Sequence, residues 1–114
     1  MQTDRELLEL AAKAAGYTIH ENGRDVNGLP WYWCDELGDV FDPLHDDGAA
    51  LRLAAKLRID IEWDEQPGGR TVEAYQRAGE SYFCATEAEA DYRRAIVRAA
   101  AGIAQAKEGA SNAS

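Results

Sequence analysis

The stretch that decides the fold class is Trp31-Tyr32-Trp33-Cys34. Successive side chains of a β-strand point to opposite faces of the sheet, so the two tryptophans share one face while Tyr32 and Cys34 share the other. Both faces are therefore bulky or apolar, which is typical of a strand whose sheet is covered on both sides. We expect a sheet with helices packed on both of its faces.

Two segments on either side of this strand have the period of an amphipathic helix. Thr3-Asp4-Arg5-Glu6 has the pattern of a capping box, in which the threonine hydroxyl accepts a backbone N–H at the start of a helix. Apolar residues follow at helical spacing as far as Gly16. Asp46 or Asp47 can cap a second helix, which runs to about Leu57. Each helix offers an apolar face that can pack against the sheet.

A third helix is predicted near the end of the chain. Thr86-Glu87-Ala88-Glu89 is a second capping-box pattern, and the apolar residues after it keep a period of 3.6. Residues 109–114 have nothing to bury, so we expect a frayed tail there and a single domain over residues 1–108. The stripe predicted to face the core consists of Ala95, Ile96, Ala99 and Ile103.

The remaining segments alternate as strands do. Residues 17–20 read as one strand, and residues 71–76 and 81–85 read as a hairpin. In residues 59–63 isoleucine and tryptophan alternate with two acids, so this strand has one solvent-exposed face. Together the segments predict an α+β fold. We expect a mainly antiparallel sheet of about five strands with helices on both faces, in the order α-β-β-α-β-β-β-α.

Acidic residues are concentrated in one part of the chain. The net charge is −9, and residues 21–50 hold eight acidic side chains against a single basic one, Arg24. Between Asp35 and Asp47 there are six acids and no lysine or arginine. Such a surface attracts basic partners and repels nucleic acid. The alternative interpretation is a solvated face that keeps the protein soluble.

Aromatic residues lie around this acidic stretch. An aromatic centre with a charged rim is the composition of a protein-binding hot spot. The alternative is that these aromatic side chains belong to the core. The partner-binding residues predicted on this basis are Trp31, Asp35, Glu36, Asp39, Phe41 and Asp42.

No motif in the sequence predicts catalysis. There is no Gly-x-Ser-x-Gly elbow, and no glycine-rich loop joins a strand to a helix as a phosphate-binding loop does. The spacings of His20, Cys34, His45 and Cys84 match no zinc site, and residues 42–48 lack the acid spacing of a calcium loop. We expect no enzymatic activity, no metal and no cofactor.

The cysteines and the hydropathy bear on location. The two cysteines, Cys34 and Cys84, lie in strand-like segments. We expect reduced thiols, as in cytoplasmic proteins, and the alternative is a structural disulfide. No apolar run approaches the ~20 residues of a membrane helix, and the charged N-terminal segment is unlike a signal peptide. We expect a cytoplasmic protein that does not enter a membrane.

Three stretches carry a family resemblance. They are FDPLHDDGAALRLAAKLRI at residues 41–59, YRRAIVRAAA at residues 92–101 and RELLELAAKAAGY at residues 5–17. With these the chain resembles the phage ABA-sandwich-domain family of small proteins from tailed bacteriophages and prophages. The resemblance implies a sheet between helical layers, and it carries no settled activity and no catalytic residues. His45 departs from the family, which commonly has a small hydroxyl residue there.

Size, charge and the phage resemblance together indicate a function. We expect a small acidic phage accessory protein that binds and inhibits or modulates a host protein with a basic surface. One example would be a counter-defence (anti-CRISPR-like) inhibitor of a nucleic-acid-handling complex, because a basic groove that holds nucleic acid attracts an acidic surface. The alternatives are a structural or assembly protein of the phage and a small-molecule-binding (sequestering) protein with a tryptophan-lined pocket.

Overall fold

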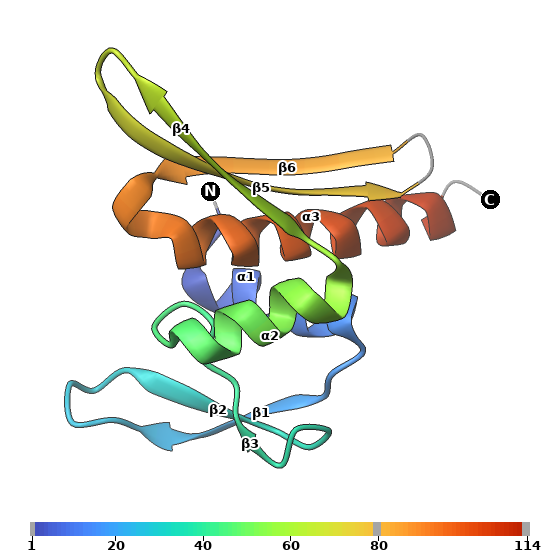
Figure 1. The fold of residues 1–114 in the computed structure, drawn as a ribbon. Helices are drawn as coiled ribbons and strands as arrows, with labels where there is room; N and C mark the ends of the chain where they lie inside the picture. The colour runs from blue at the N-terminus through green and yellow to red at the C-terminus, as the bar shows by residue number, and fades with distance from the viewer. Residues whose placement is uncertain (1, 79–80, 113–114) are drawn as a thin grey trace.

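The computed structural model describes residues 2–78 and 81–112. This part of the chain forms three α-helices, six strands and a short 3₁₀ helix (Figure 1). In chain order the elements are α1 (Asp4–Ala15), β1 (Ile19–Arg24), β2 (Pro30–Cys34), β3 (Asp39–Val40), α2 (Asp47–Leu57), β4 (Asp60–Gln66), β5 (Gly69–Ala78), β6 (Ser81–Ala88), η1 (Glu89–Asp91) and α3 (Tyr92–Asn112).

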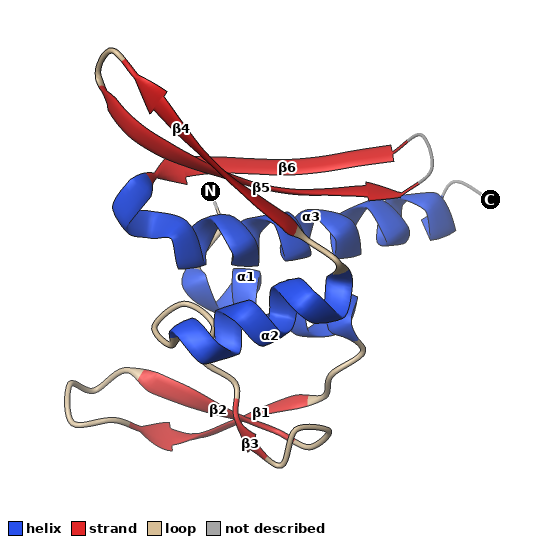
Figure 2. Cartoon of the chain, in the orientation of Figure 1, coloured by secondary structure: helices blue, strands red, loops and turns tan. Residues whose placement is uncertain are grey.

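The strands form two separate antiparallel sheets, in the orders β1-β2-β3 and β4-β5-β6. The helices lie between the two sheets, with α3 against β4–β6 and α2 toward β1–β3 (Figures 1 and 2). The α+β class and the antiparallel pairing are confirmed. The expected single sheet of about five strands is instead two three-stranded sheets, because every strand pairs with its neighbour in the chain and α2 separates β3 from β4.

The division into two sheets also explains the double-faced strand β2. Tyr32 and Cys34 are 5% and 0% exposed and belong to the core. Trp31 and Trp33 alternate with them and are only half-buried. The sequence predicted that a helical layer covers this second apolar face of β2. In the structure the face stays partly open to solvent.

The starts of α1 and α2 confirm the predicted caps. The Thr3 hydroxyl accepts the backbone N–H of Glu6 at 3.2 Å, and the Asp46 carboxylate accepts the backbone N–H of Ala49 at 3.0 Å. Each bond satisfies one of the N–H groups that the first turn of a helix leaves without a partner. Of the two candidates for α2, Asp46 is the cap and Asp47 is the first helical residue.

The capping box predicted at Thr86 is wrong. Thr86 lies in β6, opposite Glu73 of β5, and pairing continues as far as Ala88. A 3₁₀ turn follows, and α3 begins at Tyr92 without a side-chain cap on the turn. The hydrogen bonds of the long β5–β6 ladder outweigh the single local bond that a cap would supply.

Helix α3 is buried on more than one side. The predicted stripe of Ala95, Ile96, Ala99 and Ile103 is confirmed, with exposures of 0–3%. Val97 and three further alanines are also buried because sheet β4–β6 contacts one side of the helix and α1 and α2 contact the other. The small alanine side chains allow these close approaches. The helix runs to Asn112, into the segment expected to fray, and residues 113–114 lie outside the described part.

Sheet β4–β6 presents one apolar and one polar face. Val72, Ala74 and Ala85 are 0–3% exposed and pack in the core with α3. The residues that alternate with them point away from the helices. Within the described residues, no helix is long and apolar enough to cross a membrane.

Candidate binding surfaces

The six acids between Asp35 and Asp47 all accept hydrogen bonds from the chain itself. Asp35 Oδ2 lies 2.8 Å from His20 Nε2, and Asp39 accepts the backbone N–H of Val40 at 2.7 Å. Asp42 Oδ1 lies 2.8 Å from His45 Nδ1. Asp46 caps α2, as described above. Much of the acidity of this stretch therefore supports local structure.

Glu36 and Asp47 are tied to other elements. The Glu36 carboxylate accepts the backbone N–H of Thr18 at 2.6 Å and its hydroxyl at 3.1 Å, and these bonds hold the pKa of Glu36 below its usual value. Asp47 accepts the Tyr92 hydroxyl and, at 2.6 Å, the Arg93 guanidinium, and both lower the pKa of Asp47. Glu36 is thus a structural link between the start of β1 and the turn after β2.

Three of the six predicted partner-binding residues line one cavity. Trp31, Phe41 and Asp42 contribute to a cavity of about 370 Å³. Phe41 is 2% exposed and packs edge-on against Tyr17, with ring centroids 5.9 Å apart. It is therefore a core residue that forms part of the cavity wall, and not an exposed contact as predicted. Asp35, Glu36 and Asp39 lie outside the cavity.

Segments from three parts of the fold enclose the cavity. The first turn of α1 forms one side, the loop between β1 and β2 forms another, and the connection from β3 to α2 closes it. Apolar walls predominate, with three carboxylates, an arginine and a histidine among them. The lining residues are Asp4, Arg5, Leu8, Asp25, Asn27, Leu29, Pro30, Trp31, Tyr32, Phe41, Asp42, Leu44 and His45.

A backbone irregularity in β1 positions Trp31. The β1–β2 register shifts between Glu21 and Arg24, and Gly23 within it has φ +120°, which a residue with a side chain rarely adopts. A Cβ at Gly23 would lie 3.2 Å from the indole Nε1 of Trp31. The glycine thus allows the indole to lie directly on the strand.

Tyr32 holds a buried polar atom without a partner. Its hydroxyl makes no hydrogen bond within the described part of the chain, and the residue is 5% exposed. Burial raises the pKa of this hydroxyl, and the nearby Arg5 guanidinium lowers it. Buried hydroxyls almost always have a hydrogen-bond partner. A bound molecule could supply the hydrogen bond that the Tyr32 hydroxyl lacks.

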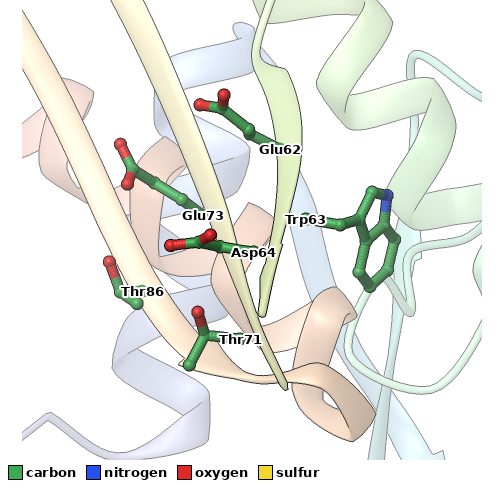
Figure 3. Close-up of a pocket in the computed structure, with 6 residues that line it drawn as sticks. All are labelled: Glu62, Trp63, Asp64, Thr71, Glu73 and Thr86. Carbon is green, nitrogen blue, oxygen red and sulfur yellow. The ribbon is translucent and has the colours of Figure 1, made fainter. Parts of the chain in front are cut away.

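A second acidic surface lies on the outer face of sheet β4–β6. Residues paired across an antiparallel sheet point to the same face, and the register places Glu62 opposite Glu73 and Asp64 opposite Thr71. Figure 3 shows their side chains on one side of the sheet, together with Thr86, while Trp63 points to the opposite side. The face also includes Asp60, paired with Tyr75.

This outer face is negative and hollowed. Asp60, Glu62 and Asp64 are exposed on this face, and Glu73 is half-buried beside them. Glu62, Trp63, Asp64, Thr71, Glu73 and Thr86 line a depression of about 430 Å³. Sequence reasoning recognised the solvent-exposed side of β4. It missed the surface because the meeting of Glu62 and Glu73 depends on the register of the β4–β5 hairpin.

The described residues form no group of three histidine, cysteine, aspartate or glutamate side chains placed to hold a metal ion. Cys34 lies buried in β2 and Cys84 exposed in β6, so the two cysteines belong to different sheets.

Comparisons with known proteins give no relative. The chain matches no protein-family model, no curated protein and no solved structure.

Proposed function

We propose that this protein is a small acidic phage or prophage accessory protein that binds a host protein through the outer face of sheet β4–β6. The partner presents a basic surface, such as the groove of a nucleic-acid-handling complex, and binding inhibits or modulates it in the host cytoplasm. The phage origin rests on the sequence resemblance in residues 5–17, 41–59 and 92–101. The docking face rests on the distribution of charge.

The observation that carries the proposal is the direct opposition of Glu62 and Glu73. Like charges opposite one another on a sheet destabilise it. Asp60 and Asp64 add two more carboxylates to the same face. A lysine or arginine of a partner, seated between these groups, would turn the repulsion into a bridged contact.

The acidic stretch from Asp35 to Asp47 supports the proposal less strongly than the sheet does. Its carboxylates already accept hydrogen bonds from histidines, backbone N–H groups and an arginine, as described above. Glu62, in contrast, makes no ion pair within the described residues. We therefore place the electrostatic contact on the sheet, and the stretch adds to the overall negative field that steers a basic partner.

Mapping the interface tests the proposal. The protein is immobilised, a host protein that binds in a salt-sensitive manner is purified, and hydrogen–deuterium exchange is compared in the free and bound protein. The expected result is slower exchange in β4 and β5 when the partner is bound. Protection confined to β1–β3 and residues 35–47 would contradict the proposed face. A captured protein without a basic surface would contradict the proposed partner.

A further inference from the structure

The cavity beside Trp31 has the dimensions and walls of a ligand site. Its volume of about 370 Å³ falls in the range of roughly 300–1,000 Å³ that small-molecule pockets occupy. Leu8, Phe41 and Leu44 are buried residues of the core that contribute apolar walls. Such sites typically combine apolar walls with a few polar groups that orient the ligand.

Tyr32, one of the residues that line the cavity, carries a buried hydroxyl without a hydrogen-bond partner in the described part of the chain. The residue is 5% exposed. A hydroxyl can donate one hydrogen bond and accept others, so it can accept an N–H from a bound molecule. A ligand that reaches it would remove the free-energy penalty of a buried group without a partner.

The charges around the cavity select the kind of ligand. Asp4, Asp25 and Asp42 line it, and Arg5 and His45 are the basic residues among the lining side chains. Both basic groups are already engaged by carboxylates. Arg5 lies 3.1 Å from Glu9 and 3.5 Å from Glu21, and His45 lies 2.8 Å from Asp42. The carboxylates are engaged as well: Asp4 lies 2.9 Å from Arg94, and Asp25 accepts the backbone N–H groups of Asn27 and Leu29. Three carboxylates against one arginine and one histidine still give the lining an excess of negative charge, which favours a cation over an anion.

Trp31 supplies a surface for the body of such a ligand. The indole is half-buried, lies on Gly23 and lines the cavity. An indole offers a large apolar surface against which the body of a ligand can pack. From the orphan hydroxyl, the excess of carboxylates and the indole, we propose that this cavity binds a small organic amine, with its ammonium near Tyr32 and Asp42 and its apolar body against Trp31. This inference does not depend on the partner proposed above.

Three probes with the same apolar body test the proposal. They are 2-phenylethylammonium, 2-phenylethanol and 3-phenylpropionate, titrated into the full chain labelled with nitrogen-15, with the indole resonance of Trp31 as the readout. The expected result is that the ammonium binds about tenfold more tightly than the alcohol and that the carboxylate causes no shift. Equal binding of the alcohol or the carboxylate would overturn the proposal, as would the absence of any Trp31 shift with the ammonium.

Two pairs of variants locate the site. Tyr32→Phe removes only the hydroxyl and should weaken ammonium binding several-fold, while Trp63→Phe, distant in sequence and on the other sheet, should not change it. Asp42→Asn should also weaken binding, whereas Asp39→Asn removes the same charge outside the cavity and should have little effect. Equal effects of Asp42→Asn and Asp39→Asn would show that only the overall negative charge of the protein attracts the ammonium, and this would overturn the proposed site. Unchanged ammonium binding in Tyr32→Phe would also overturn it.

Discussion

Glu62 of β4 lies directly opposite Glu73 of β5, so two carboxylates stand side by side on the open face of sheet β4–β6. Neither residue belongs to the acidic stretch that the sequence made conspicuous. Their proximity comes entirely from the register of a hairpin. With Asp60 and Asp64 it places four carboxylates on one face of the sheet, which is the face that we propose for a basic partner.

Neutralising one of these carboxylates should stabilise the free protein. Glu62→Gln keeps the shape of the side chain and removes the repulsion from Glu73, and like-charge pairs of this kind cost roughly 0.2–1 kcal/mol. We expect a higher urea midpoint at low salt and a smaller gain at high salt, because ions screen exposed charges. Glu6→Gln in α1 is the matched control. A lower midpoint for Glu62→Gln would contradict the repulsion.

Removing the Tyr32 hydroxyl should not weaken the fold. A buried hydroxyl without a partner costs about 1–3 kcal/mol in desolvation, so Tyr32→Phe should leave the free energy of unfolding unchanged or raise it. Chemical denaturation of the two proteins measures the difference. A loss of more than about 1 kcal/mol, the usual worth of a satisfied hydrogen bond, would mean that the hydroxyl has a stabilising partner in solution.

Glu36 should contribute to stability in a pH-dependent way. The hydrogen bonds from Thr18 lower the pKa of Glu36 in the folded protein. Its contribution is therefore fully present above the pKa of the unfolded chain and is lost as the pH falls through the lower folded pKa. We expect Glu36→Gln to lower the melting temperature at pH 7, and the difference from wild type to shrink under acidic conditions.

The control for this experiment is Asp39→Asn, which removes an exposed acid whose carboxylate accepts the backbone N–H of the next residue, Val40. It should change the melting temperature much less at pH 7. A Glu36→Gln difference that stays constant from neutral to acidic pH would show that the Thr18 bonds do not depend on the charge of Glu36.

A charge inside α3 should disrupt the core. Ile96 is 2% exposed and belongs to the central cluster, so Ile96→Asp places an unpaired charge in an apolar site and should cost several kcal/mol. Gln105→Asp on the exposed side of the same helix is the control. Thermal melting measures both. An unchanged melting temperature for Ile96→Asp would show that this position does not face the core.

The helices could be predicted from the sequence because their signals are local. A cap depends on residues within one turn, and Thr3 and Asp46 both cap as expected. The same rule failed at Thr86, where the hydrogen bonds of a strand depend on Glu73, distant in the sequence. The division into two sheets could not be predicted from the sequence either. The pattern of Trp31–Cys34 indicates which faces of the strand are apolar, but it does not indicate what packs against them.

The candidate surfaces were predicted only in part. The sequence grouped Trp31, Phe41 and Asp42, and all three line one cavity. It gave no sign that Tyr32 would bury an unsatisfied hydroxyl, because that depends on which residues, distant in the sequence, pack around this side chain. Some acidic residues cap helices or accept hydrogen bonds from nearby groups, and others face solvent on the sheet. The number of acids in a stretch of sequence does not distinguish these two kinds.

The central claim, that the face around Glu62 and Glu73 attracts the partner, is tested most directly by association rates. Once the partner is purified, its rate constant is measured with wild type, Glu62→Gln/Glu73→Gln and Asp35→Asn/Asp39→Asn, which each remove two charges. The proposal predicts that at low salt the sheet variant associates about 3- to 10-fold more slowly than the Asp35/Asp39 variant, and that high salt abolishes the difference. Equal rates for the two variants at low salt would contradict it.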